Sequence, residues 1–416
     1  MAPSKSNAFS KKALRTKDPP ISWLMKLALA RPQLISLAAG FTDSPSLPAP
    51  EIQEILQNLW KEPRSVLIAL QYGSTAGDES LRKWTRERIE KRDHLTKASF
   101  TDDQVVIGNG SQQLLSFITE ILCDPGDIIL LEDPTYFVYL GIVESCGLEA
   151  VPFADSRELR ERLARLKSKG KAGRVKLAYF VSYYRNPTGT SLASKDKREI
   201  AGILKEFEET HPIYILEDAA YRDLRFEGDD VPSFLAQDPK LERTIYTATY
   251  TKPFATGLKV GFAVAPEALV PPILRFKGNE DFGTSHFDQQ ILLRAVRSGA
   301  YEKHLEQIGQ VYRKKISVMQ QALKEHFPKE ARWTSPAGGL YFWASLPPGT
   351  DCGVESAIFK AGVDADVLYV PGELCYCESS YRKRPRHQMR LSFGSASIDQ
   401  IREGIRRLGQ VLKKSM

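Results

Sequence analysis

The chain has 416 residues, of which 42% are hydrophobic and 26% are charged, as in an ordinary globular protein. A chain of this length rarely keeps a single hydrophobic core, so we expect two domains or one domain with a large appendage. The formal net charge of +7 is modest and favours anionic small molecules at least as much as nucleic acid. No apolar run approaches the roughly 20 residues of a membrane span, so the composition argues against a membrane protein.

The cysteines and the N-terminus contain no targeting or metal signal. The five cysteines are an odd number without paired CxxC spacing, which argues against a disulfide framework and a metal site. We therefore expect free thiols and a cytoplasmic protein. The basic segment 1–17 lacks the apolar stretch of a secretory signal, and we expect a frayed tail rather than a transit peptide.

In chain order, the first elements are a short strand or extended segment at 35–40, helices at 51–60 and 79–91, and a strand that begins at Val105. A glycine turn follows this strand, and Ser111 is placed to cap a helix that begins at Gln112.

Short apolar runs then alternate with helical segments. The runs are 128–131, 177–181, 213–216 and 244–247. Strands buried on both faces and separated by helices predict a mostly parallel sheet in an α/β domain. Ligands of such sheets bind beyond the carboxyl ends of the strands. Four polar residues come just after apolar runs and are expected to meet there: Ser111, Asn186, Asp218 and Lys252.

From about Phe287 the pattern changes to a long helix through Leu323, three short strands and a final helix from Ile398. The three strands are predicted at 339–343, 367–370 and 389–393. This part is expected to form a smaller α+β domain. The predicted division is an N-terminal arm with part of the small domain at 1–48, a large domain at 49–285 and the rest of the small domain at 286–416.

Lys252 lies in Thr-Tyr-Thr-Lys, downstream of Asn186-Pro-Thr-Gly and Asp218-Ala-Ala-Tyr221. A lysine in such a turn can bind an aldehyde cofactor covalently, and it can serve as the base that moves a proton. A buried carboxylate such as that of Asp218 would keep a pyridine nitrogen protonated. The ordered motifs therefore indicate pyridoxal phosphate (PLP) chemistry.

A phosphate group and a substrate carboxylate need further partners. The glycine turn with Ser111 and Gln112 would offer a free helix N-terminus to the phosphate. Three residues, Thr249, Thr251 and Lys259, would complete this phosphate site. Arg390 alternates with apolar residues in a late strand, so its guanidinium either enters a cleft and binds a carboxylate or lies on an exposed edge.

From about Ser22 to Leu412 the chain resembles the class I/II aminotransferases of the fold-type I PLP-dependent superfamily. Within it, the chain is most similar to the 2-aminoadipate and kynurenine aminotransferases. This resemblance rests on Ile35 to Gly40, Tyr72 with Gly77 and Leu81-Arg82, Gly110 to Gln113, Pro134 to Tyr136, and Gly338-Gly339.

The resemblance implies a seven-stranded, mostly parallel sheet in the large domain and a homodimer with shared active sites. Lys252 would bind the cofactor, Asp218 would face the pyridine nitrogen, and Tyr136 would stack on the ring. Asn186 and Tyr221 would hydrogen-bond the ring oxygen. The phosphate would be held by Ser111, Gln112, Thr249, Lys259 and Tyr72 of the partner subunit. Arg390 and Asn186 would bind the substrate carboxylate near Gly40.

The chain departs from the family at Lys259, where arginine is usual, and at Thr256, where proline is usual. A lysine offers a point charge in place of a two-pronged guanidinium, which weakens phosphate binding without changing the charge.

The leading functional hypothesis is an aminotransferase that moves an amino group between an amino acid and a 2-oxo acid in two half-reactions. A PLP-dependent lyase, synthase or decarboxylase is an alternative, because the fold does not fix which bond breaks. A cofactor-sensing regulatory module is another, although the sequence shows no helix-turn-helix and no basic DNA-binding helix. Aromatic residues in the predicted loops hint at apolar or aromatic amino donors.

Overall fold

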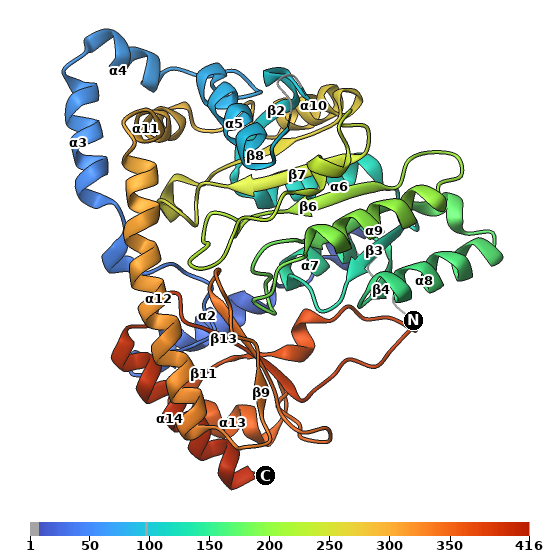
Figure 1. The fold of residues 1–416 in the computed structure, drawn as a ribbon, viewed down its shortest axis with the longest axis vertical. Helices are drawn as coiled ribbons and strands as arrows, with labels where there is room; N and C mark the ends of the chain where they lie inside the picture. The colour runs from blue at the N-terminus through green and yellow to red at the C-terminus, as the bar shows by residue number, and fades with distance from the viewer. Residues whose placement is uncertain (1–7, 96–98, 416) are drawn as a thin grey trace.

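The computed structural model describes residues 8–95 and 99–415. Its largest sheet has seven strands in the order β2-β8-β7-β6-β5-β3-β4, shown in the upper part of Figure 1. The strands are β2 (Val105–Asn109), β3 (Ile128–Glu132), β4 (Glu149–Phe153), β5 (Val175–Val181), β6 (Tyr214–Asp218), β7 (Thr244–Thr249) and β8 (Val260–Val264). The pairings β7-β6-β5-β3-β4 are parallel, whereas β8 runs antiparallel to both β2 and β7.

Helices cover this sheet because its strands are apolar on both faces. Alternate residues of β5 enter two different clusters: Leu177 and Tyr179 join the main core, while Ala178 and Phe180 join a smaller core under α8 and α9. The helices of this region are α3 (Ala49–Trp60), α4 (Pro63–Leu70), α5 (Glu79–Arg92), α6 (Gly110–Leu122), α7 (Phe137–Cys146), α8 (Ser156–Ser168), α9 (Ser194–Glu206), α10 (Val270–Glu280) and α11 (His286–Arg297).

A smaller antiparallel sheet, β12-β13-β10-β9, lies below the large sheet in Figure 1. Its strands are β9 (Arg332–Trp333), β10 (Tyr341–Ser345), β12 (Val370–Pro371) and β13 (Gln388–Ser392). A separate parallel pair joins β1 (Ile35–Ser36) to β11 (Val367–Leu368), so the N-terminal segment packs with the C-terminal one. The accompanying helices are α2 (Pro20–Ala30), α12 (Ala300–His326), α13 (Ala357–Asp364) and α14 (Ile398–Ser415).

The observed sheets confirm the predicted fold class, while the division at 1–48, 49–285 and 286–416 stays a prediction. Three strands were not foreseen: β4, an edge strand that contains Glu149 and Pro152, β8, hidden in the glycine-rich lysine motif, and the two-residue β9 at the edge of the small sheet. The predicted helix 287–323 divides into α11 and α12, because Gly299 adopts a left-handed φ of 77° between them.

The N-terminal segment differs from the expected frayed tail in the part that the structure describes. Residues Lys11–Arg15 form helix α1, which Ser10 caps. Arg15 Nε donates to the carbonyl oxygen of Ser145 at 3.1 Å, and Lys12 pairs with Glu120 at 2.7 Å. Residues 1–7 of the predicted tail lie outside the described residues. No helix in the described ranges combines the length and apolarity that crossing a bilayer requires.

Candidate active site

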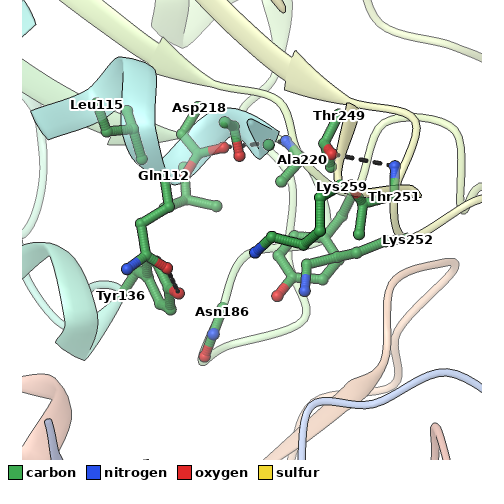
Figure 2. A pocket seen from close by; sticks show the side chains of 14 residues that line it. Gln112, Leu115, Tyr136, Asn186, Asp218, Ala220, Thr249, Thr251, Lys252 and Lys259 are labelled. Carbon is green, nitrogen blue, oxygen red and sulfur yellow. Dashed lines mark hydrogen bonds between the residues drawn. The ribbon is translucent and has the colours of Figure 1, made fainter. Parts of the chain in front are cut away.

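A cavity opens at the carboxyl edge of the large sheet. The parallel strands end at this edge, and β8 begins there because it runs the opposite way. Ten of the predicted site residues line the cavity: Ser111, Gln112, Tyr136, Asn186, Asp218, Tyr221, Thr249, Thr251, Lys252 and Lys259. Figure 2 shows the side chains of Lys252 and Lys259 extending into the same space. The parallel topology therefore brings residues that lie far apart in the sequence to one edge of the sheet, where they form one site.

Asp218 is the last residue of β6 and is 4% exposed. Its carboxylate accepts hydrogen bonds from the Tyr179 hydroxyl at 2.9 Å and from the Ala220 N–H at 3.1 Å. No described lysine or arginine forms an ion pair with it. Burial raises the pKa of Asp218 to about 6, against the opposing effect of the two hydrogen bonds and of Lys252. This acid is thus a buried anion that a cationic ligand group would stabilise.

Lys252 follows β7 in the turn that precedes β8. Thr249 and Thr251 fix this turn, since both hydroxyls donate to the Val260 carbonyl, at 3.2 and 3.4 Å. The Lys252 amine lies 5.3 Å from the centre of the Tyr221 ring. It forms no ion pair with any described acid, so its amine is free to react with a ligand in the cavity.

The start of α6 suits a phosphate group. The helix begins at Gly110, two residues before the predicted start at Gln112, and its N-cap Asn109 makes no capping hydrogen bond. Because Asn109 does not cap the helix, the N–H groups of its first turn are left without a protein acceptor. The Lys259 amine lies about 4.0 Å from the point that a Cβ atom on Gly110 would occupy. A phosphate group would therefore meet a helix N-terminus and a cation together.

Close approach at this turn requires glycine at position 261. An added Cβ on Gly261 would lie 2.5 Å from the Gly110 carbonyl carbon and the Ser111 nitrogen. The absence of a side chain lets β8 contact the turn directly, which brings Lys259 over the helix N-terminus. The free N–H groups, the amine of Lys252 and the buried Asp218 together fit an aromatic aldehyde that carries a phosphate.

Arg390 comes from β13 and is 1% exposed. Its Nη1 donates to Asn186 Oδ1 at 2.7 Å, and its Nη2 donates to the Ala38 carbonyl at 2.6 Å. Its Nε has no partner in the described chain, and no described acid forms an ion pair with it. The exposed-edge alternative for Arg390 is therefore wrong. A buried guanidinium with spare donors is a binding site for a carboxylate.

Three predicted residues do not line the cavity: Gly40, Tyr72 and Arg390. Arg390 still reaches the site through Asn186, and Gly40 lies against the Tyr341 hydroxyl. Tyr72 is 82% exposed, and its ring contacts Phe282 with ring centres 5.3 Å apart. The structure thus does not bring Tyr72 into this chain's own cavity.

Two tyrosines near the site were missed by sequence reasoning. Tyr179 lies inside a predicted apolar strand, donates to Asp218 and stacks on Tyr139 with ring centres 3.7 Å apart. Tyr341 lies in β10 and contacts Tyr221 and Arg390. A tyrosine within a buried strand needs a hydrogen-bond partner, and that requirement was the available signal.

Comparison with known proteins gives this geometry a family. The family model of aminotransferase class I and II matches residues 35–408. The chain is 32% identical over 422 residues to aromatic-amino-acid aminotransferase 1 of Thermococcus litoralis, covering 98% of this chain and 94% of that protein. It is 31% identical to the 2-aminoadipate transaminase of Thermus thermophilus, covering 98% and 97%.

Among solved structures, the kynurenine aminotransferase of Pyrococcus horikoshii, in complex with PMP, has a TM-score of 0.88 at 30% identity and 98% coverage of both chains. The predicted family, cofactor and activity are confirmed by these matches. The chain belongs to the class I and II aminotransferases and is a PLP-dependent transaminase.

Proposed function

We propose that the cavity at the carboxyl edge of the large sheet is the transaminase active site and that Lys252 binds the cofactor covalently. One observation carries this proposal: the free amine of Lys252, the buried Asp218 and the open N-terminus of α6 all border one cavity. An aldehyde, a pyridine nitrogen and a phosphate are the three groups that these partners would recognise. PLP, when bound, supplies an electron sink that stabilises negative charge on the α-carbon of the amino acid.

Asp218 is proposed to keep the pyridine nitrogen protonated. Its carboxylate is nearly dry and has no cationic partner, so a protonated nitrogen would provide the missing charge. Tyr179 and Ala220 hold one carboxylate oxygen each, which fixes the direction in which the acid points. Tyr136 lines the same cavity from the start of α7 and is proposed to cover the ring.

Arg390 and Asn186 are proposed to bind the substrate carboxylate. Asn186 and the Ala38 carbonyl each engage one terminal nitrogen of Arg390, whereas Nε has no partner, so Nε and the second N–H of Nη2 stay available for a bidentate contact. With the carboxylate fixed, the α-carbon of the substrate would lie over the Lys252 amine. Once the amino group of the substrate has displaced the Lys252 amine from the cofactor, Lys252 would take the α-proton and move it to the cofactor side, as one step in the exchange of the amino group.

A homodimer with shared active sites is also proposed. Large apolar side chains are exposed on and after α3 and α4: Trp60 55%, Leu67 71%, Ile68 51%, Leu70 63% and Tyr72 82%. Figure 1 shows α3 and α4 standing at one edge of the molecule. A second copy would cover this face, and the partner subunit's Tyr72 would reach the phosphate.

The amino donor is proposed to be apolar or aromatic. Tyr136, Tyr221, Phe137 and Tyr341 surround the position of the carboxylate, and two of them pack on the Arg390 guanidinium.

A reducing, cytoplasmic location is proposed because all five cysteines are buried and free. Burial raises the pKa of each of these thiols, which keeps them unreactive.

The experiment is borohydride reduction of the PLP-loaded protein, followed by peptide mapping. We expect the reduced label on Lys252, and Lys252→Ala should lose the label together with essentially all turnover. Lys259→Met is the matched control, because it removes the other cavity amine and should keep the label on Lys252. A label on Lys259 or on any other residue in the wild type would refute the assignment.

A further inference from the structure

Tyr341 is a buried residue of β10 that contacts two residues of the proposed site, Tyr221 and Arg390. It is 1% exposed. In the β10–β13 pair, Tyr341 faces Ser392 and Trp343 faces Arg390, so Tyr341 and Arg390 share one face of the small sheet. The Arg390 guanidinium carbon lies 4.2 Å from the centre of the Tyr341 ring. The ring therefore packs on the cation proposed to bind the substrate carboxylate.

The hydroxyl of Tyr341 meets the hydroxyl of Tyr221 at 3.0 Å, and either atom can donate. Burial raises the pKa of both hydroxyls, so each carries one proton at neutral pH. The charged groups that face Tyr341 are Arg390 and Lys252, which are hydrogen-bond donors when charged. Tyr221 faces Asp218, Tyr136 and Arg390 in addition.

The two tyrosines differ in what else they reach. Tyr221 lines the cavity, whereas Tyr341 does not. In the described chain, the hydroxyl of Tyr221 is the one hydrogen-bond partner of the Tyr341 hydroxyl. When the Tyr341 hydroxyl donates this hydrogen bond, the Tyr221 oxygen accepts it. The Tyr221 hydroxyl can then direct its own single proton into the cavity. A hydrogen bond received by a hydroxyl also strengthens the one that it donates.

We propose that Tyr341 is a positioning residue of transamination, whose hydroxyl orients the Tyr221 proton toward the ring oxygen of PLP while its ring supports Arg390. This inference rests on the proposed function, in which Tyr221 contacts the cofactor. It joins the cofactor end and the carboxylate end of the site through one side chain. Gly40 provides the space, since a Cβ at position 40 would collide with the Tyr341 hydroxyl.

The test is the pH titration of the visible absorption of bound PLP in Tyr341→Phe, Tyr221→Phe and the double variant. A hydrogen bond to the ring oxygen favours the deprotonated cofactor and lowers the midpoint of this titration. We expect Tyr221→Phe to raise the midpoint by about one pH unit and Tyr341→Phe by about half a unit. Because Tyr341 acts through Tyr221, the double variant should match Tyr221→Phe alone.

The kinetic constants provide a second readout. Tyr341→Phe retains the ring on Arg390, so the KM of the amino donor should stay within about twofold, while kcat falls about threefold. Tyr341→Leu removes the ring and should raise this KM by about tenfold. Tyr369→Phe is the matched control, because Tyr369 is a buried tyrosine of the same region that donates to Cys352 at 3.0 Å. Its titration midpoint should equal that of the wild type.

Different failures are distinguishable. An unchanged midpoint in Tyr341→Phe, with a shifted midpoint in Tyr221→Phe, overturns the inference and leaves the proposed site intact. Additive shifts in the double variant also overturn it, because Tyr341 would then act independently of Tyr221. An unchanged midpoint in Tyr221→Phe overturns the proposed role of Tyr221 and, with it, the inference.

Discussion

Glu217 and Asp218 are consecutive residues of β6, and the fold treats their carboxylates in opposite ways. Their side chains point to opposite faces of the strand. Glu217 is fully buried and pairs with the equally buried Lys197 at 3.0 Å. Asp218 faces the cavity and has hydrogen bonds but no cation. One acid is neutralised by the protein, and the other is left for a ligand.

The same contrast, between charges with a partner in the protein and charges without one, separates the cavity from the rest of the molecule. Away from the cavity, buried cations have acidic partners: Lys315 pairs with Asp43 at 2.6 Å, and Arg222 pairs with Asp93 at 2.5 Å. At the cavity, Lys252, Lys259 and Arg390 form no ion pair with any described acid. A buried charge without a partner destabilises the fold, so Arg390 and Asp218 carry a cost that a bound carboxylate and a bound cation would relieve. Lys252 is half-buried and Lys259 is exposed, so these two amines carry little of that cost. Unpaired charge distinguishes the site from the scaffold.

The largest effect is expected for Asp218→Asn. The variant keeps the shape of the side chain but removes the charge that would hold the pyridine nitrogen protonated. We expect kcat/KM to fall on the order of a thousandfold, with little loss of stability. Steady-state transamination kinetics and denaturant unfolding check the two parts. Near-normal turnover would show that catalysis does not need the Asp218 charge, and it would remove the contrast between Asp218 and Glu217.

Glu217→Gln should give the reverse result at the neighbouring position. Lys197 would keep its hydrogen bond to the Pro232 carbonyl at 2.9 Å but lose its charge partner in a dry environment. We expect the free energy of unfolding to fall by about 3 kcal/mol, with the bound-cofactor absorption retained. Urea unfolding measures the loss. Glu403→Gln, which breaks a surface pair with Arg406, is the control and should cause no measurable change.

The smallest effect is a pH dependence of the cofactor-free protein. Burial raises the pKa of Asp218 to about 6, above the value of about 3.9 in an unfolded chain. The folded state therefore binds the proton more tightly, and Asp218 lowers stability as the pH rises from about 4 through about 6. Relative to Asp218→Asn, the wild type should gain stability as the pH falls from about 7 to about 5. Melting curves of both proteins would contradict this if their difference stayed constant.

Much of the site follows from local sequence. Asp218 ends one buried strand and Lys252 follows another, and the parallel arrangement of β5, β6 and β7 suffices to bring such residues to one edge. The start of α6 was misjudged at Ser111, because a serine beside a glycine turn is a good cap in isolation. In the fold, Asn109 precedes the helix without capping it, and the first turn stays open.

The sequence by itself determined the order of strands and helices and the polar residues that end each strand, since side-chain periodicity and turn chemistry are local properties. Tertiary structure decided which distant side chains meet. Arg390 reaches Asn186 across 204 positions, and Tyr341 reaches Tyr221 across 120. These contacts depend on the pairing of β10 with β13 and on how the two sheets pack, and no local pattern encodes that packing. Whether a buried charged group has an oppositely charged partner is likewise decided by its neighbours in three dimensions.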